Sequence, residues 1–150
     1  MNWVMLVYKL PKSKTSANKV SVWRKLKKLG VYPLQDSVCL LPYSERTLEN
    51  FEWLSEEIKE MGGEATLWQT SSLATQDEER IIEYFLEQTN QQYQEIIKAA
   101  QDVVSLKHLQ ALWTMYNRVK QQDYLKSPLW IEVKGTLERK AQDLSRKGEE

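Results

Sequence analysis

The hydrophobic pattern at the start of the chain predicts a strand followed by a helix. Residues 3–8 form an apolar run that closes before Pro11, which cannot donate to a β-ladder. Apolar side chains then recur at i, i+4 and i+7, up to a glycine that suits a helix C-terminus: Val22, Leu26, Leu29 and Gly30. The first 30 residues therefore predict one buried strand and one amphipathic helix.

The next 40 residues predict two short strands, a second helix and a last strand. Residues 31–42 indicate two strands around a turn near residues 35–37. Ser44 is typical of an N-cap, and the apolar positions that follow keep a period near 3.6 until Gly62. Residues 64–69 then alternate between polar and apolar positions, as expected of a strand with one face buried.

This order of elements over residues 1–70 predicts an α+β fold, a ferredoxin-like βαββαβ domain. Its two helices would cover one face of an antiparallel sheet. The other face and the edges would need cover from a partner subunit or from the rest of the chain.

Residues 71–150 predict a helical region of about three helices. The first starts near Thr75, the second near Ser105, and Ser127 with Pro128 supplies an N-cap and a first-turn proline for the third. No low-complexity linker separates this region from the sheet domain. We therefore expect the helices to pack on or beside it.

Charge is strongly segregated along the chain, although the net charge is zero. Residues 1–35 contain eight basic residues and no acidic one, whereas residues 36–102 contain fifteen acidic and four basic residues. Segregation of this kind can focus an electrostatic field on one face of a protein.

The basic cluster near the first helix is the main candidate site. Its members occupy two adjacent segments without a nearby acid: Lys12, Lys14, Arg24, Lys25, Lys27 and Lys28. Three interpretations remain open. The glutamates of the second helix or of the acidic third helix could neutralise the cluster internally, or it could contact nucleic-acid phosphates, or it could bind a small oxyanion.

The residue inventory argues against catalysis and against a bound metal or cofactor. The chain has one cysteine, Cys39, and one histidine, His108, so neither a disulfide nor a zinc or iron–sulfur site is expected. It contains no glycine-rich phosphate loop and no nucleophile motif. We therefore expect a protein that is not an enzyme and that uses no cofactor.

The opening apolar run is too short to span a bilayer and lacks the basic start of a signal peptide. We interpret it as a strand, and expect a cytoplasmic protein that makes no membrane contact.

Several strings in the chain are similar to the N-terminal region of the chromate-resistance regulator ChrB family. They are WVMLVYKLP at residues 3–11, VWRKLKKLG at 22–30, LQDSVCLLP at 34–42, GGEATLW at 62–68 and DYLKSPL at 123–129. Trp53-Leu54 extends the similarity, which spans most of the chain.

The resemblance implies a DNA-binding transcriptional regulator, or an accessory, of a chromate efflux operon. It also implies a sheet domain like those of PaaX-type regulators and Cas2-type nucleases, which usually form homodimers. Carried over by position, four basic residues of the first helix would contact DNA phosphates or a chromate-like oxyanion: Arg24, Lys25, Lys27 and Lys28. The alternative is a protein-interaction or dimerisation module without nucleic-acid binding.

The chain departs from these relatives at two points. Cas2-type nucleases place a metal-binding aspartate at the end of the first strand, where this chain has Tyr8-Lys9, and its first carboxylate is Asp36. Metal-dependent nuclease activity is therefore not expected. Members of the ChrB family also carry a further C-terminal domain, and ligand sensing located there is not transferred to these 150 residues.

Overall fold

The computed structural model describes residues 1–13 and 15–149, and for Glu149 it describes the backbone alone. The chain divides into two compact units, Met1–Ile81 and Ile82–Glu150. The first residues of the third helix belong to the first of these units. We describe each unit by itself.

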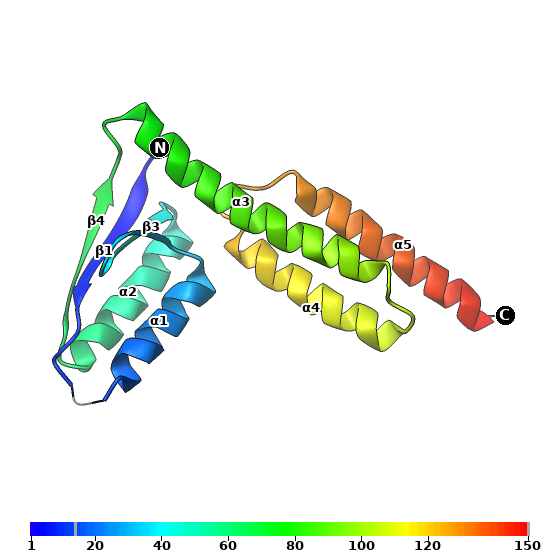
Figure 1. The fold of residues 1–150 in the computed structure, drawn as a ribbon, viewed down its shortest axis with the longest axis horizontal. Helices are drawn as coiled ribbons and strands as arrows, with labels where there is room; N and C mark the ends of the chain where they lie inside the picture. The colour runs from blue at the N-terminus through cyan, green and yellow to red at the C-terminus, as the bar shows by residue number, and fades with distance from the viewer. Residues whose placement is uncertain (14, 150) are drawn as a thin grey trace. The chain divides into compact units, whose positions relative to one another are not determined.

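The first unit contains a four-stranded sheet. Its strands are β1 (Trp3–Lys9), β2 (Tyr32–Gln35), β3 (Val38–Pro42) and β4 (Glu64–Thr70) (Figure 1). Their order in the sheet is β2-β3-β1-β4, and every neighbouring pair is antiparallel. This order is that of the predicted ferredoxin-like fold, so the predicted α+β class is confirmed.

Two helices, α1 (Ala17–Leu29) and α2 (Glu45–Glu60), lie side by side against one face of this sheet (Figure 1). Alternation along β1 explains the packing, because Val4 and Leu6 are fully buried whereas Met5, between them, is half-buried. The helices contribute Val22 and Phe51 to the same buried set.

Glycines end both helices for conformational reasons. Gly30 has a φ of +69° and ends α1, and Gly62 has a φ of +90° directly after α2. Gly63 is needed for space, because a Cβ there would lie 2.5 Å from the carbonyl oxygen of Lys9. The predicted ends of both helices are confirmed.

The other face of the sheet is partly covered within the first unit by the start of α3 (Thr75–Ala100). A hollow of about 270 Å³ remains there, lined by Trp3, Met5 and Leu40 from the sheet and by Arg80 and Ile81 from α3. The start of α3 therefore covers part of the sheet face that the sequence left without a helix.

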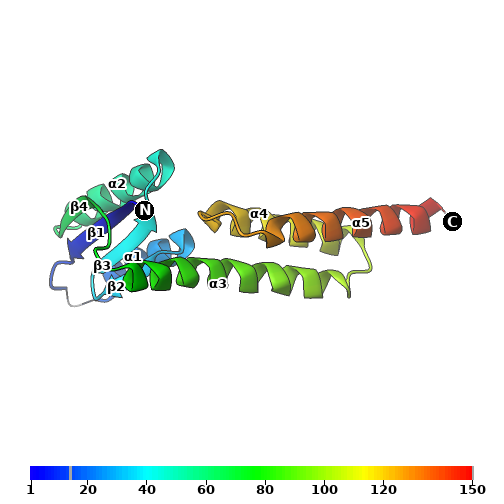
Figure 2. The ribbon, with the colours of Figure 1, turned by 90° about the horizontal axis from the view of Figure 1, so that it is seen from above.

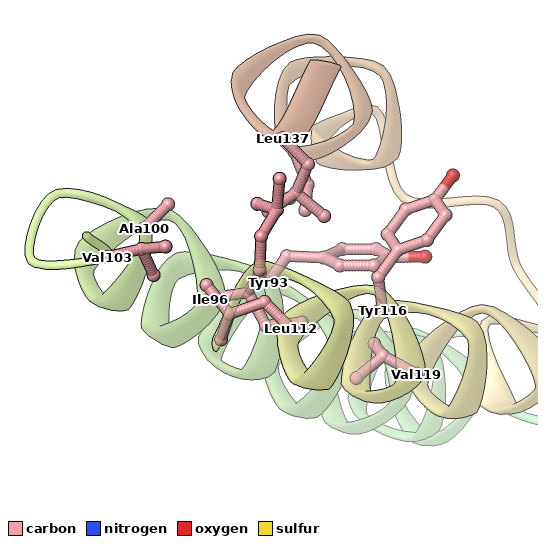
Figure 3. Close-up of a cluster of buried hydrophobic side chains, with 10 residues drawn as sticks. Tyr93, Ile96, Ala100, Val103, Leu112, Tyr116, Val119 and Leu137 are labelled. Carbon is pink, nitrogen blue, oxygen red and sulfur yellow. The ribbon is translucent and has the colours of Figure 1, made fainter. Parts of the chain in front are cut away.

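The second unit contains the rest of α3 with α4 (Leu106–Gln122) and α5 (Leu129–Glu149), which lie side by side within the unit (Figure 2). Its core is a cluster of buried side chains from these helices and, at Val103, from the segment between α3 and α4 (Figure 3): Tyr93, Ile96, Ala100, Val103, Leu109, Leu112, Tyr116, Val119, Val133 and Leu137. The predicted helical region is confirmed.

The segment between α4 and α5 is held by a hydrogen-bonded tie. The carboxylate of Asp123 accepts a bond from the Tyr93 hydroxyl at 3.0 Å and one from the Ser127 N–H at 2.8 Å. Ser127 in turn contacts Asn90, and its hydroxyl accepts the N–H of Leu129 at 3.2 Å. Ser127 therefore acts as the predicted cap of α5.

Candidate nucleic-acid interface on the first helix

The cations of α1 line an exposed side of the first unit. Arg24, Lys27 and Lys28 are exposed, Lys25 is half-buried, and Lys12 is exposed in the loop that precedes the helix. Lys14, which also belongs to the predicted set, lies outside the described residues. The structure thus brings four of the six predicted residues onto one helix.

The cations do not all lie on one side of that helix. A shallow hollow follows the outer side of α1 over three turns, and we call its lining the basic stripe: Ala17, Val20, Ser21, Arg24, Lys25 and Lys28. Lys27 lies outside the stripe, with its ammonium 4.9 Å from the centre of the Trp23 ring. The sequence therefore grouped four cations of which the structure places three together.

One of these cations has an acidic partner on α2. Lys25 forms an ion pair with Glu57, and both side chains stay more than a third exposed to solvent. A pair this open to solvent contributes little, typically about 0.2–1 kcal/mol. Internal neutralisation, the first of the three predicted alternatives, is thus observed for Lys25.

Arg24, Lys27 and Lys12 behave differently. Within the part of the chain that the structure describes, no ion pair joins any of these three to a carboxylate. The start of α1 adds positive potential, because its first turn contains no acidic residue and the Ser16 side chain makes no capping bond. The charge of these three side chains is therefore left for solvent ions or a ligand to balance.

The outer side of α2 carries the opposite charge. A second shallow hollow follows that helix, and we call its lining the acidic stripe: Glu45, Leu48, Glu49, Glu52, Trp53 and Glu56. Trp53 is 68% exposed. The spacing of these glutamates at three and four residues is visible in the sequence and places them on one side of a helix.

Two further reactive side chains, Cys39 and His108, lie outside both stripes. Burial raises the pKa of the Cys39 thiol to about 12, so the thiolate is disfavoured at neutral pH. His108 is exposed at the start of α4, where its backbone N–H donates to the Ser105 side chain at 3.3 Å. Among the described residues, no group of three or more histidine, cysteine or carboxylate side chains is placed to hold a metal ion.

Over the described residues, none of the helices is long and apolar enough to cross a membrane.

Comparison with known proteins supplies the family. Neither a curated protein nor a solved structure matches the chain. Residues 19–110, from α1 into α4, match the family model described as "Protein ChrB, N-terminal". Because this match covers more than half of the 150 residues, the chain belongs to the ChrB N-terminal family and is a chromate-resistance-related protein.

Proposed function

We propose that the first unit binds the phosphate backbone of DNA through α1, as part of controlling the expression of chromate-resistance genes in the cytoplasm. The observation that carries the proposal is the exposed positive side of α1, in a stretch of 35 residues that contains no acidic residue. Membership of the ChrB N-terminal family supports the regulatory context.

The shape of the surface favours a polyanion over a small oxyanion. Arg24 and Lys28 lie one turn apart along the helix, and both side chains are exposed. A small tetrahedral anion would need several donors that converge on one point. A duplex presents a row of phosphates, which matches an extended stripe of cations and gives affinity without reading sequence.

The proposal involves binding and no catalytic step. Asp36, the first carboxylate of the chain, is exposed in the turn between β2 and β3, and it follows the end of β1 by 27 positions. We expect no cleavage of DNA or RNA in the presence of magnesium or manganese. Metal-dependent cleavage that survives repurification would contradict this part of the proposal.

Fluorescence anisotropy with a labelled duplex tests the proposal. Replacing Arg24, Lys25, Lys27 and Lys28 together by alanine should weaken binding at low salt by at least tenfold, because four phosphate-directed cations are removed. A charge-matched control replaces four exposed cations of the second unit: Lys98, Lys107, Arg118 and Arg146.

The control variant should keep most of the wild-type affinity. Equal losses in the two variants would mean that only net charge matters and that α1 is not the interface. If the wild-type protein does not bind DNA even at low salt, the proposal fails, and a protein-interaction module becomes the better reading.

A further inference from the structure

The two outer helices of the first unit carry stripes of opposite charge. We propose that this helix layer is a self-association surface, on which the basic stripe of one copy contacts the acidic stripe of a second copy. The occupant is thus another molecule of the same chain, related by a two-fold axis. Charge complementarity between the stripes carries the inference.

Among the described residues, three glutamates of the acidic stripe form no ion pair within one copy: Glu45, Glu49 and Glu52. Lys25 and Glu57 form the ion pair that joins α1 to α2. The glutamates of the acidic stripe are all exposed, and Glu56 has a partner on its own helix, Lys59, at 3.6 Å. Arg24 forms no ion pair with a carboxylate among the described residues.

An exposed aromatic side chain, Trp53, lies within the acidic stripe. Trp53 precedes Glu57 by one helical turn, so it lies on the same side of α2 as the residue that reaches α1. With 68% of its surface exposed, it can supply apolar contact near the centre of the layer, surrounded by charges. An aromatic centre inside a polar rim is the usual anatomy of a protein interface.

The direction of the two-fold axis decides which helices meet across the interface. β1 and β3 are antiparallel, and α1 and α2 each return from the end of one of these strands, so the helices are also antiparallel (Figure 1). A two-fold axis parallel to the helices places α1 over α2 of the second copy. An axis perpendicular to them would place α1 over α1, where like charges repel.

The same cations cannot contact phosphate and a second copy at once. Self-association and DNA binding should therefore exclude each other, so that DNA releases the paired copies. This part of the inference rests on the proposed function, whereas the pairing itself does not.

A charge-swap experiment on the full chain tests the pairing. One variant, Arg24→Glu with Lys28→Glu, leaves both stripes with a net negative charge. The other, Glu49→Lys with Glu56→Lys, cancels the negative charge of the acidic stripe and keeps the basic stripe unchanged. Sedimentation equilibrium at low salt should find dimers for the wild type, monomers for each variant alone, and dimers again in an equimolar mixture. Far-UV circular dichroism checks that both variants fold.

Failure of the mixture to form dimers would overturn the inference, as would a monomeric wild type or a variant that dimerises alone as the wild type does. Trp53→Ser provides a further test without a charge change. It should raise the dissociation constant of the dimer at least tenfold, and an unchanged constant would contradict the central position of Trp53.

DNA binding by the Glu49→Lys, Glu56→Lys variant separates this inference from the proposed function. The monomeric variant should bind duplex DNA at least as tightly as the wild type. Restored dimers in the mixture without any DNA binding would leave the pairing standing and the proposed function refuted. DNA binding without restored dimers would leave the proposed function standing and refute the pairing.

Discussion

At the scale of single residues, Asp123 shows how a surface loop is fixed by one half-buried acceptor. Its two carboxylate oxygens accept from the Tyr93 hydroxyl and from the Ser127 N–H, so the end of α4 is tied to α3 and to the start of α5. Burial, followed by the proximity of Asp123, raises the pKa of the Tyr93 hydroxyl, which therefore stays protonated and remains a donor.

Replacing Asp123 by alanine should lower the free energy of unfolding by about 1–3 kcal/mol, because two donors lose their acceptor. Urea denaturation measures the effect, and Asp143→Ala, at an exposed position of α5, is the control. If the two variants unfold at the same urea concentration, the tie at Asp123 has no net stabilising effect.

Two glycines should respond to alanine with opposite sign. At Gly63 a Cβ would lie 2.5 Å from the Lys9 carbonyl oxygen and 2.9 Å from Ile58, so the alanine variant should lose about 1–3 kcal/mol of stability. Gly135 lies inside α5, and Arg139 is 3.5 Å away, so the alanine variant there should gain about 0.5–1 kcal/mol. Thermal unfolding of both variants checks the sign, and a stabilising Gly63→Ala would contradict the close approach of Gly63 to the Lys9 carbonyl oxygen.

Cys39 should be inert while the protein is folded. Its folded pKa of about 12 lies above the ordinary 9.0, so its contribution to stability is present below pH 9 and is lost as the pH rises toward 12. Iodoacetamide at pH 8 should label the native protein far more slowly than the protein in denaturant. Equal labelling rates would show that the thiol is accessible in the native state.

At the scale of elements, the ends of helices could be predicted from the local sequence, whereas contacts between helices could not. The end of α1 could be predicted because only glycine adopts a φ of +69° readily, and the start of α2 because Ser44 accepts the N–H of Thr47. Neutralisation by a glutamate of the second helix was one of the expected alternatives, but the particular pair could not be predicted. Lys25 and Glu57 are 32 residues apart in the chain, so their contact depends on how the two helices pack together. The position of Lys27 over the Trp23 ring also depends on the folded structure, so the sequence alone grouped Lys27 with the other cations of α1.

This ion pair gives a prediction about α1 as an interface. Glu57→Gln removes the acid that competes for Lys25, so affinity for DNA at low salt should increase about two- to fivefold, the range expected for a surface pair. Glu60→Gln makes the same change of net charge at an exposed position of α2 and should have a smaller effect. If both variants gain equally, Lys25 does not act at the interface.

At the scale of the whole chain, a net charge of zero hides two regions of opposite character. The first 35 residues carry eight bases without an acid, and the acids that balance them begin in the strand pair and continue through α2 into α3. The separation of sheet and helical regions was predictable from periodicity. The position of their division was not, because the first residues of α3 have the same helical pattern as the rest of that helix.

The central claim, that α1 contacts a row of phosphates, is tested most directly by the salt dependence of DNA binding. Each phosphate contact contributes about 0.9 to the slope of log K against log salt concentration. The account predicts a steep slope for the wild-type protein that becomes shallower by about 2–4 when Arg24, Lys25, Lys27 and Lys28 are replaced by alanine. Identical slopes for the two proteins would contradict it.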